Sequence, residues 1–268
     1  MFQPMSHLEQ RLYFALSEKE QRVFTIRDII GVLNVSSQHA RNLAARMVQK
    51  NAVERVKSGL FVRIPENVIL GKGLYREDAI LIADKAVEDT FLSHYTALSL
   101  HGLEERYANR VYVTTRRRQR NIHYHDVHIQ YITVMPQRFF GMETMSYSND
   151  TITVADRERA IMDAVNAPRY SGGWSEVISC LRNLEVVDWE KLQSYLVRFG
   201  NKSLARRIGY LMEKLKNVSL PEDVKRRMRE LSGDSIYYFD RPREGSLDKG
   251  WNLVVPDRIR RVLLAETA

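Results

Sequence analysis

Residues 25–50 read Thr-Ile-Arg-Asp-Ile-Ile-Gly-Val-Leu-Asn-Val-Ser-Ser-Gln-His-Ala-Arg-Asn-Leu-Ala-Ala-Arg-Met-Val-Gln-Lys, and this stretch decides the fold of the first part of the chain. Apolar side chains recur at helical spacing after Thr25, which stands where an N-cap residue accepts a hydrogen bond from the first turn. The pattern breaks over 34–36, and a second helical pattern, capped by Ser36, runs to about Lys50. The stretch therefore predicts two short helices joined by a tight turn.

Further elements flank these two helices. An amphipathic pattern predicts an earlier helix from about Ser6 to Leu16. We expect its inward side chains to close a small core, and these are Leu8, Leu12 and either Phe14 or Ala15. After Lys50, two alternating apolar segments meet at Ser58-Gly59, a dipeptide typical of a tight turn. Three helices followed by a hairpin predict a winged helix-turn-helix domain over residues 1–66.

The polar side of the second helix carries side chains that bond to base edges and phosphates. Arginine suits guanine, asparagine and glutamine suit adenine, and serine tolerates either. Basic side chains of the hairpin are expected along the phosphate backbone. The predicted DNA-binding residues are Ser36, Ser37, Gln38, Arg41, Asn42 and Arg46 of the helix and Arg55, Lys57, Ser58 and Arg63 of the wing. The alternative is a helical bundle whose polar face is only solvated.

The whole-chain composition sets further bounds. The chain has 268 residues, of which 44% are hydrophobic, so a second and larger domain is expected over 74–268. A formal net charge of +8 predicts attraction to polyanions. The one cysteine, Cys180, excludes an internal disulfide framework. No run reaches the ~18 apolar residues that cross a bilayer, which favours a soluble, cytoplasmic protein with no membrane partner.

The second domain is predicted to combine strands and helices. Segments rich in β-branched and aromatic residues predict strands at 110–115, 128–134, 142–147 and 151–154. Helical periodicity predicts helices at 76–87, 94–101, 156–165, 172–181, 188–199, 202–215 and 221–231, and a late strand is expected at 251–255. The fold class is therefore α+β: a winged helix-turn-helix followed by a larger mixed α/β domain, in which helices flank a small sheet.

Two groups of side chains between the predicted strands carry alternative interpretations. Four arginines crowd one loop, where they either bind phosphates or form a solvated hairpin tip, and we favour the phosphate contact. These are Arg116, Arg117, Arg118 and Arg120. His123 and His125 have the spacing of two metal ligands on one strand face, but no third ligand has convincing spacing. Surface histidines are the favoured interpretation, and we predict no metal site.

Catalytic signatures are weak. Asp156, Glu158 and Asp163 cluster at the start of a predicted helix, where the helix dipole stabilises negatively charged side chains. The alternative is that these acids bind metal in a nuclease that the winged helix delivers to DNA. The sequence contains no Gly-rich phosphate loop, no Gly-x-Ser-x-Gly and no His-Glu-x-x-His. We therefore predict a protein that is not an enzyme, with no catalytic residue and no cofactor.

The order of several motifs resembles the AbiEi-type antitoxins of type IV toxin-antitoxin systems. The motifs lie at 58–65, 92–103, 139–143 and 154–163, followed by Pro168 and Gly172-Gly173. The resemblance implies a winged-helix repressor of its own operon that binds inverted repeats in promoter DNA, either as a homodimer or as cooperative monomers. It also implies that the protein neutralises a nucleotidyltransferase-like toxin without forming a stable complex. A regulator whose second domain binds a small molecule is the remaining alternative.

Overall fold

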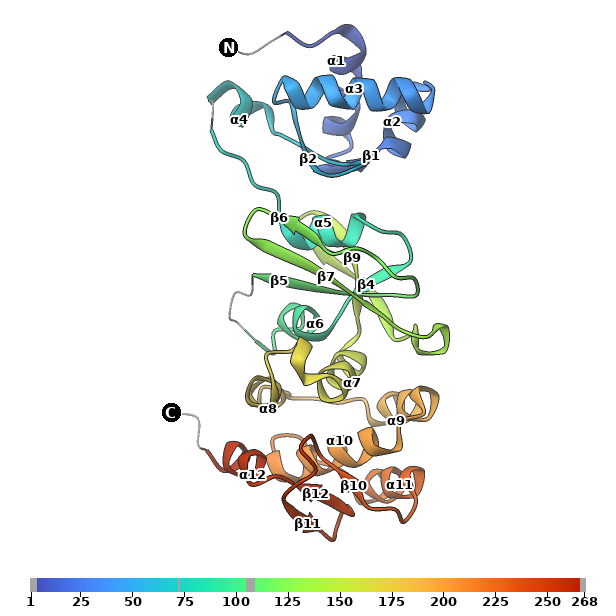
Figure 1. Ribbon diagram of the computed structural model, residues 1–268, viewed down its shortest axis with the longest axis vertical. Helices are drawn as coiled ribbons and strands as arrows, with labels where there is room; N and C mark the ends of the chain where they lie inside the picture. Colours follow the sequence, from blue (N-terminus) through green and yellow to red (C-terminus); the bar gives the residue numbers. More distant parts are fainter. Residues whose placement is uncertain (1–3, 72, 105–108, 266–268) are drawn as a thin grey trace. The chain divides into compact units, whose positions relative to one another are not determined.

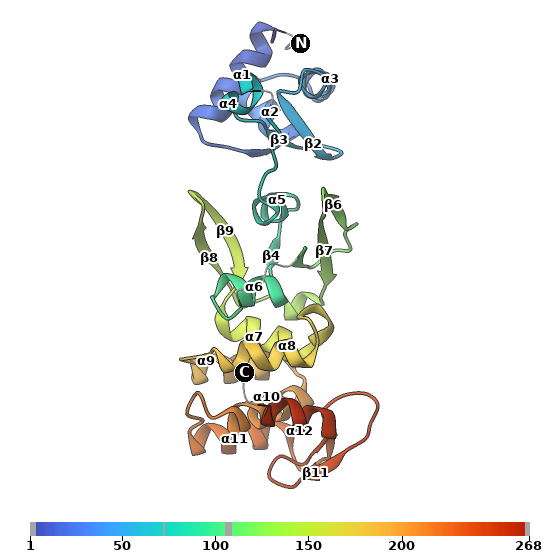
Figure 2. The ribbon, with the colours of Figure 1, turned by 90° about the vertical axis from the view of Figure 1, so that its left-hand side faces the viewer.

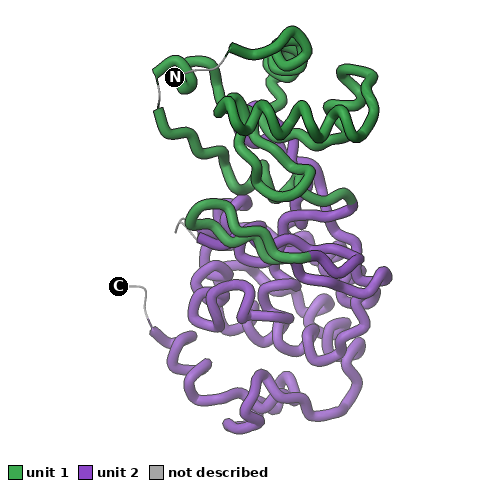
Figure 3. Tube along the Cα trace, turned by 45° about the horizontal axis from the view of Figure 1, so that its top comes forward, with its two compact units in different colours: residues 1–88, 120–130 green, residues 89–119, 131–268 purple. Residues whose placement is uncertain are grey.

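The computed structural model describes residues 4–71, 73–104 and 109–265, and the chain divides into two compact units (Figure 1, Figure 3). Unit 1 comprises Met1–Glu88 and Arg120–Gln130, and unit 2 comprises Asp89–Gln119 and Tyr131–Ala268. The sequence predicts a domain boundary between residues 66 and 74, whereas the compact units divide after Glu88. Within the described ranges, no helix has the length and apolar character that a membrane span requires.

Unit 1 contains the predicted winged helix-turn-helix (Figure 1). Its elements in chain order are α1 (His7–Glu18), β1 (Val23–Thr25), α2 (Ile26–Leu33), α3 (Ser37–Gln49), β2 (Val53–Lys57) and β3 (Leu60–Arg63). The three strands form an antiparallel sheet in the order β1-β3-β2. The tight turn between α2 and α3 and the hairpin β2–β3 confirm the fold that the sequence predicts for this region.

Caps fix where the two central helices begin. The Thr25 hydroxyl accepts from the backbone N–H of Asp28 at 3.4 Å, and the Thr25 N–H donates to the Asp28 carboxylate at 2.6 Å. Helix α2 ends at Asn34, whose backbone is left-handed with φ +53°. The Ser36 hydroxyl then accepts from the N–H of His39 at 3.2 Å and starts α3. Both N-caps are those that the sequence predicts.

The core of the winged helix is apolar and closed. Helix α1 contributes Leu12 and Leu16, both 0% exposed, and the rings of Phe24 and Phe61 stack with their centroids 5.7 Å apart. Of the two residues that the sequence offers for the third inward position, Phe14 is 55% exposed and Ala15 is partly buried. Tyr13, on the adjacent face of α1, is buried instead and donates its hydroxyl to the carbonyl of Ile64 at 2.7 Å.

Unit 1 continues beyond the winged helix. A short helix α4 (Glu66–Gly71) lies in the stretch between the two predicted domains. Helix α5 (Ala79–Lys85) is shorter than the predicted 76–87, and it begins at Ala79 because the Asp78 side chain caps it. The strands β6 (Ile122–Tyr124) and β7 (Val127–Thr133) form a hairpin, of which β6 is not predicted. Strand β7 begins in unit 1 and ends in unit 2.

Unit 2 is built on a sheet whose strands lie in the order β5-β4-β9-β8. Its own strands are β4 (Thr90–Leu92), β5 (Arg110–Thr115), β8 (Met142–Tyr147) and β9 (Asp150–Ala155), and β4 runs parallel to β9. Helices α6 (His94–Leu100) and α7 (Arg157–Asn166) pack on this sheet and on each other. The short 3-10 turns η1 (Pro136–Arg138) and η2 (Pro168–Tyr170) connect these elements.

The remaining elements of unit 2 include the long helix α10 and the helices that pack against it (Figure 2). They are α8 (Trp174–Arg182), α9 (Trp189–Phe199), α10 (Lys202–Leu215), α11 (Glu222–Ser232), β10 (Tyr237–Tyr238), β11 (Ser246–Asp248), β12 (Leu253–Val255) and α12 (Asp257–Leu264). Helix α10 contacts α7, α8, α9 and α11, and Trp251, fully buried, lies against Gly209 in it. Strands β10 and β11 and helix α12 are not predicted by the sequence pattern. The mixed α/β class itself is confirmed.

Candidate DNA-binding site

Helix α3 presents a polar face that is free of apolar side chains. Ser37, Gln38, Arg41 and Asn42 are all exposed, as is the cap residue Ser36. The Gln38 amide donates to the Asn42 side-chain oxygen at 3.1 Å, as side chains four residues apart on a helix do. The opposite face is buried through Ala40, Leu43 and Met47. The core therefore fixes the rotation of α3 and leaves its polar face open to solvent.

Arg46 differs from the other predicted contact residues because a buried carboxylate binds it. Its Nε lies 3.1 Å from Oε1 of Glu9, whose side chain is 0% exposed, and the Lys50 Nζ lies 2.7 Å from Oε2. Burial raises the pKa of Glu9, but hydrogen bonds from Lys50, the Ser6 N–H and Arg46 outweigh burial and lower it to about 2. Arg46 is thus held in place, with 45% of its side chain exposed.

Glu9 is a residue of the site that the sequence prediction missed. Its signal is the spacing Ser6-x-x-Glu9, the pattern of a capping box, in which the Glu9 carboxylate accepts from the Ser6 N–H at 2.7 Å. That spacing predicts a helix start, but only the packed structure shows that the same carboxylate lies against α3. Glu9 therefore joins the first helix to the polar helix.

Of the four predicted residues of the wing, two are exposed and a third is partly buried. Arg55 and Ser58 are exposed, and the Arg55 guanidinium lies 5.7 Å from the centroid of the Phe61 ring. Gly59 has φ +81°, a conformation that glycine adopts without strain, and closes the hairpin turn. Lys57 is partly buried, and this burial lowers its pKa.

The prediction that Arg63 lies on the phosphate backbone is wrong. Arg63 is only 9% exposed, and its guanidinium packs over the Tyr13 ring at 5.4 Å from the centroid. The alternation of the strand suggests a surface position, but all four residues of β3 are buried. Side chains of a strand point to the two faces of a sheet, and on the face of Arg63 the Tyr13 ring of α1 covers the guanidinium.

The hairpin β6–β7 meets the wing within unit 1. The Tyr124 hydroxyl donates to Glu54 Oε2 at 3.0 Å, and His125 Nε2 lies 3.0 Å from Glu54 Oε1. His125 sits in the hairpin turn with φ +52°, whereas His123 lies on β6 with its ring 4.2 Å from that of His128. His123 and His125 therefore contact different residues: His123 lies against His128, and His125 pairs with Glu54. The Glu54 carboxylate in β2 is bound by Tyr124 and His125 of the hairpin.

The four predicted loop arginines have different environments. Arg116 pairs with Asp89 at 2.6 Å, and its guanidinium lies 5.0 Å from the centroid of the Phe139 ring. Arg117, Arg118 and Arg120 are exposed. Arg120 belongs to unit 1 and the other three belong to unit 2. The charge of Arg116 is thus partly neutralised by Asp89, whereas Arg117, Arg118 and Arg120 are exposed to solvent.

The three acids at the start of α7 are held by the protein itself. Asp156 caps the helix by accepting from the Arg159 N–H at 2.9 Å, and it also accepts from the Tyr195 hydroxyl at 2.7 Å. Glu158 accepts from the Asp188 N–H at 3.1 Å. Asp163 pairs with the fully buried Arg159 at 2.9 Å. All three carboxylates are buried, which supports the capping interpretation rather than a metal-binding one.

Three helices, of which α3 has an exposed polar face, and a three-stranded sheet with the wing β2–β3 define a winged helix-turn-helix fold. A family model described as "Transcriptional regulator, AbiEi antitoxin" matches residues 11–64. This match confirms the resemblance to AbiEi-type antitoxins over the winged helix, the part of the chain that the family model covers.

A solved structure has the same fold. The crystal structure of the RV2827C protein from Mycobacterium tuberculosis is 15% identical to this chain, with a TM-score of 0.62. The similarity covers 97% of this chain and 94% of that chain, so it extends over both units. At this identity the likeness shows the fold alone. No curated protein matches the sequence.

Proposed function

We propose that this protein is a transcriptional repressor that binds double-stranded DNA through α3 and the wing, and that it is the autoregulating antitoxin of a type IV toxin-antitoxin system. The observation that carries the proposal is the exposed polar face of α3, set on a capped helix within the region that matches the antitoxin family model. The expected operator is an inverted repeat in its own promoter, bound by a homodimer or by cooperative monomers.

The contacts follow from side-chain chemistry. Helix α3 enters the major groove, where Arg41 suits guanine and Asn42, hydrogen-bonded to Gln38, suits adenine. Ser36 and Ser37 lie at the exposed N-terminus of the helix, whose free N–H groups favour a phosphate. Arg55, Lys57 and Ser58 of the wing, together with the exposed arginines of the loop after β5, bind phosphates. Arg46 is anchored by Glu9 and contributes its charge rather than a base contact.

The test is a binding titration of the purified chain on its own upstream DNA. We expect Arg41→Ala or Asn42→Ala to weaken specific binding by roughly 1–3 kcal/mol per lost base contact. Lys57→Ala should instead weaken specific and non-specific binding alike and lower the salt slope by about 1. The matched control is Arg11→Ala, which removes an exposed arginine from α1 and should bind like the unaltered chain.

Two results would contradict the proposed contacts. Equal affinity of the Arg41→Ala and Asn42→Ala variants for the upstream DNA would exclude α3 from base contacts. DNA cleavage in the presence of divalent metal, abolished by Asp156→Asn, would instead indicate a nuclease. The antitoxin role is tested separately: co-expression should restore growth to cells that produce the nucleotidyltransferase-like toxin, and co-purification should recover no stable complex.

A further inference from the structure

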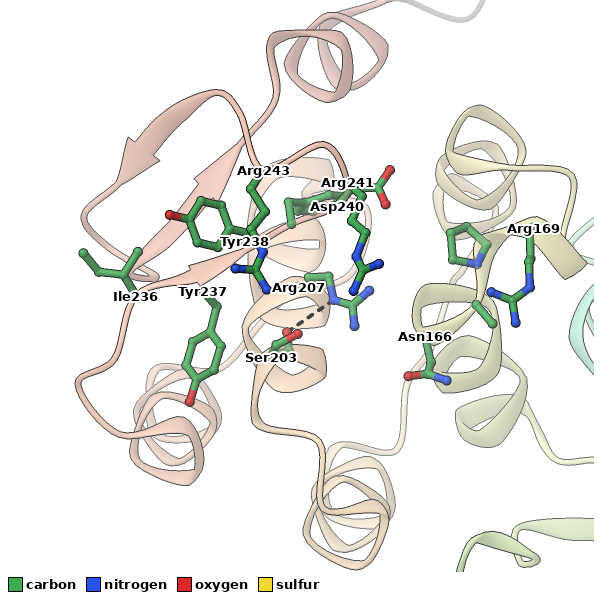
Figure 4. Close-up of a pocket in the computed structure, with 13 residues that line it drawn as sticks. Asn166, Arg169, Ser203, Arg207, Ile236, Tyr237, Tyr238, Asp240, Arg241 and Arg243 are labelled. Atoms are coloured by element: carbon green, nitrogen blue, oxygen red, sulfur yellow. Dashed lines mark hydrogen bonds between the residues drawn. The ribbon is translucent and has the colours of Figure 1, made fainter. Parts of the chain in front are cut away.

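Unit 2 contains a cavity of about 670 Å³ that plays no part in the proposed DNA contacts (Figure 4). The end of α7 and η2 form one side, α10 forms another, and the segment 236–243 after α11 closes it. Its lining includes four arginines, which are Arg169, Arg207, Arg241 and Arg243. Figure 4 shows Arg207 and Arg241 extending toward the side that Asn166 and Arg169 form. The cavity is therefore lined by four positively charged hydrogen-bond donors and one carboxylate, that of Asp240.

Arg207 is the most constrained of these four side chains. It is partly buried, and its Nη1 and Nε donate to the carbonyls of Val165 at 3.0 Å and Ser203 at 3.4 Å. These neutral acceptors fix the side chain without neutralising it, and no carboxylate of the described residues lies within 4.0 Å of its guanidinium. Burial lowers the pKa of Arg207 to about 10, which leaves it charged at neutral pH.

The acid that lines the cavity is occupied elsewhere. Asp240 Oδ2 accepts from the Trp174 indole N–H at 2.7 Å and from Arg258 at 2.7 Å. Arg169 and Arg243 lie over tyrosine rings, with centroid distances of 4.5 Å to Tyr170 and 5.4 Å to Tyr238. Neither ring removes positive charge. Asp240 is thus bound to Trp174 and Arg258, and although its charge also acts on Arg207, four arginines face this one carboxylate in the lining.

We propose that this cavity binds the phosphate groups of a small polyphosphate ligand such as a nucleoside triphosphate. A guanidinium presents two parallel N–H groups that match two phosphate oxygens, and Arg207 is held ready for this contact by its backbone acceptors. The volume of about 670 Å³ falls within the range typical of small-ligand sites, roughly 300–1,000 Å³. A concave recess of this size suits a compact polyanion better than the rod of a duplex.

The experiment is calorimetric titration of the full chain with pyrophosphate and with ATP. Arg241→Gln is the principal variant, because Arg241 is exposed and its guanidinium forms no ion pair with the described residues. Arg207→Lys keeps the charge but removes the planar fork. The matched control is Arg226→Gln on α11, whose side chain is 73% exposed and lies outside the cavity. Circular dichroism melting of each variant verifies that it folds.

We expect both ligands to bind the unaltered chain, and both cavity variants to weaken binding at least tenfold while Arg226→Gln changes it less than twofold. An equal loss in Arg226→Gln would overturn the proposal, because it would indicate attraction to net charge. Absence of heat and of any melting shift at millimolar ligand would also overturn it. Tighter binding of a single-stranded RNA than of ATP, dependent on Arg207, would assign the cavity to nucleic acid instead. No arm uses operator DNA, so this result is independent of the proposed repressor function.

Discussion

The ion pairs of Glu9 give the sharpest test of how the winged helix is held together. Replacing Glu9 with glutamine keeps the size of the side chain and removes the charge that Lys50 and Arg46 bind. The carboxylate is 0% exposed, and its pKa is lowered from 4.5 to about 2. Since each unit of pKa shift corresponds to about 1.36 kcal/mol, the charged form contributes roughly 3 kcal/mol to the stability of unit 1.

The sign of the pH dependence follows from the lowered pKa. Because the folded state holds the proton less tightly than the unfolded state, the contribution is fully present above about pH 4.5 and is lost as the pH falls toward 2. We expect this loss of stability in the unaltered chain and a much flatter profile in Glu9→Gln. At pH 7 the variant should be less stable by roughly 2–3 kcal/mol. The loss is expected to be somewhat smaller than the contribution of the charged carboxylate, because Arg46 and Lys50 regain part of their hydration.

Native-state hydrogen exchange with mass spectrometry measures this effect where it occurs. At pH 7, amides of α1 and α3 should lose roughly 30- to 150-fold of their protection in Glu9→Gln, the equivalent of 2–3 kcal/mol. Glu18→Gln removes an exposed acid from the same helix and serves as the control. All three tryptophans, Trp174, Trp189 and Trp251, belong to unit 2, so urea unfolding followed by fluorescence should change little. Protection in Glu9→Gln within twofold of the unaltered chain would refute the reasoning.

Two further predictions concern unit 2. Gly209→Ala should destabilise it by at least ~1–3 kcal/mol in fluorescence-monitored urea unfolding, because the added Cβ overlaps the buried Trp251 indole. The comparison is Gly31→Ala in α2 of unit 1, which has open space around its Cβ and should be neutral or stabilising by up to ~1 kcal/mol. Because the tryptophans lie in unit 2, this variant is followed by hydrogen exchange of the α2 amides, and a loss of stability equal to that of Gly209→Ala would contradict the packing argument. Burial, together with Glu104, raises the pKa of Cys180 to about 12. The native thiol should therefore react with a thiol reagent at pH 8 far more slowly than the thiol unfolded in guanidinium, and a rapid native reaction would show an accessible thiolate.

Several elements of the fold are predictable because their signals are local. Thr25 and Ser36 cap α2 and α3 through contacts within three residues, and the strand 110–115 and the helix 202–215 have the predicted bounds. Strands β10 and β11 have two and three residues, too few for a period to be detectable. Strand β11 pairs with β12 across the turn that follows Asp248, and β10 pairs in parallel with β12, so both depend on β12 rather than on a pattern of their own. Short elements of this kind form only when a neighbouring strand already exists.

The candidate site shows the same division. The polar face of α3 is visible in the sequence because an amphipathic helix must bury its apolar side and leave the other side exposed. The sequence does not reveal that Arg63 is buried, since that depends on Tyr13 of the distant helix α1 packing against its guanidinium. The sequence does not single out Glu9 or Arg207 for a related reason. Their defining hydrogen bonds, from Arg46 and Lys50 to Glu9 and from Arg207 to the Val165 carbonyl, join residues that are 37 to 42 positions apart in the chain.

By itself, the sequence determined the class of fold, the caps and rotation of the helix proposed to contact DNA, and the absence of recognisable catalytic motifs. These features depend on periodicity and on hydrogen bonds between near neighbours, so a linear pattern contains them. Only the tertiary structure decided which charged side chains remain at the surface, which carboxylates are neutralised, and that arginines from α10 and the segment after α11 line one cavity. Long-range packing sets burial and charge pairing, because both depend on which distant segments exclude water from a side chain.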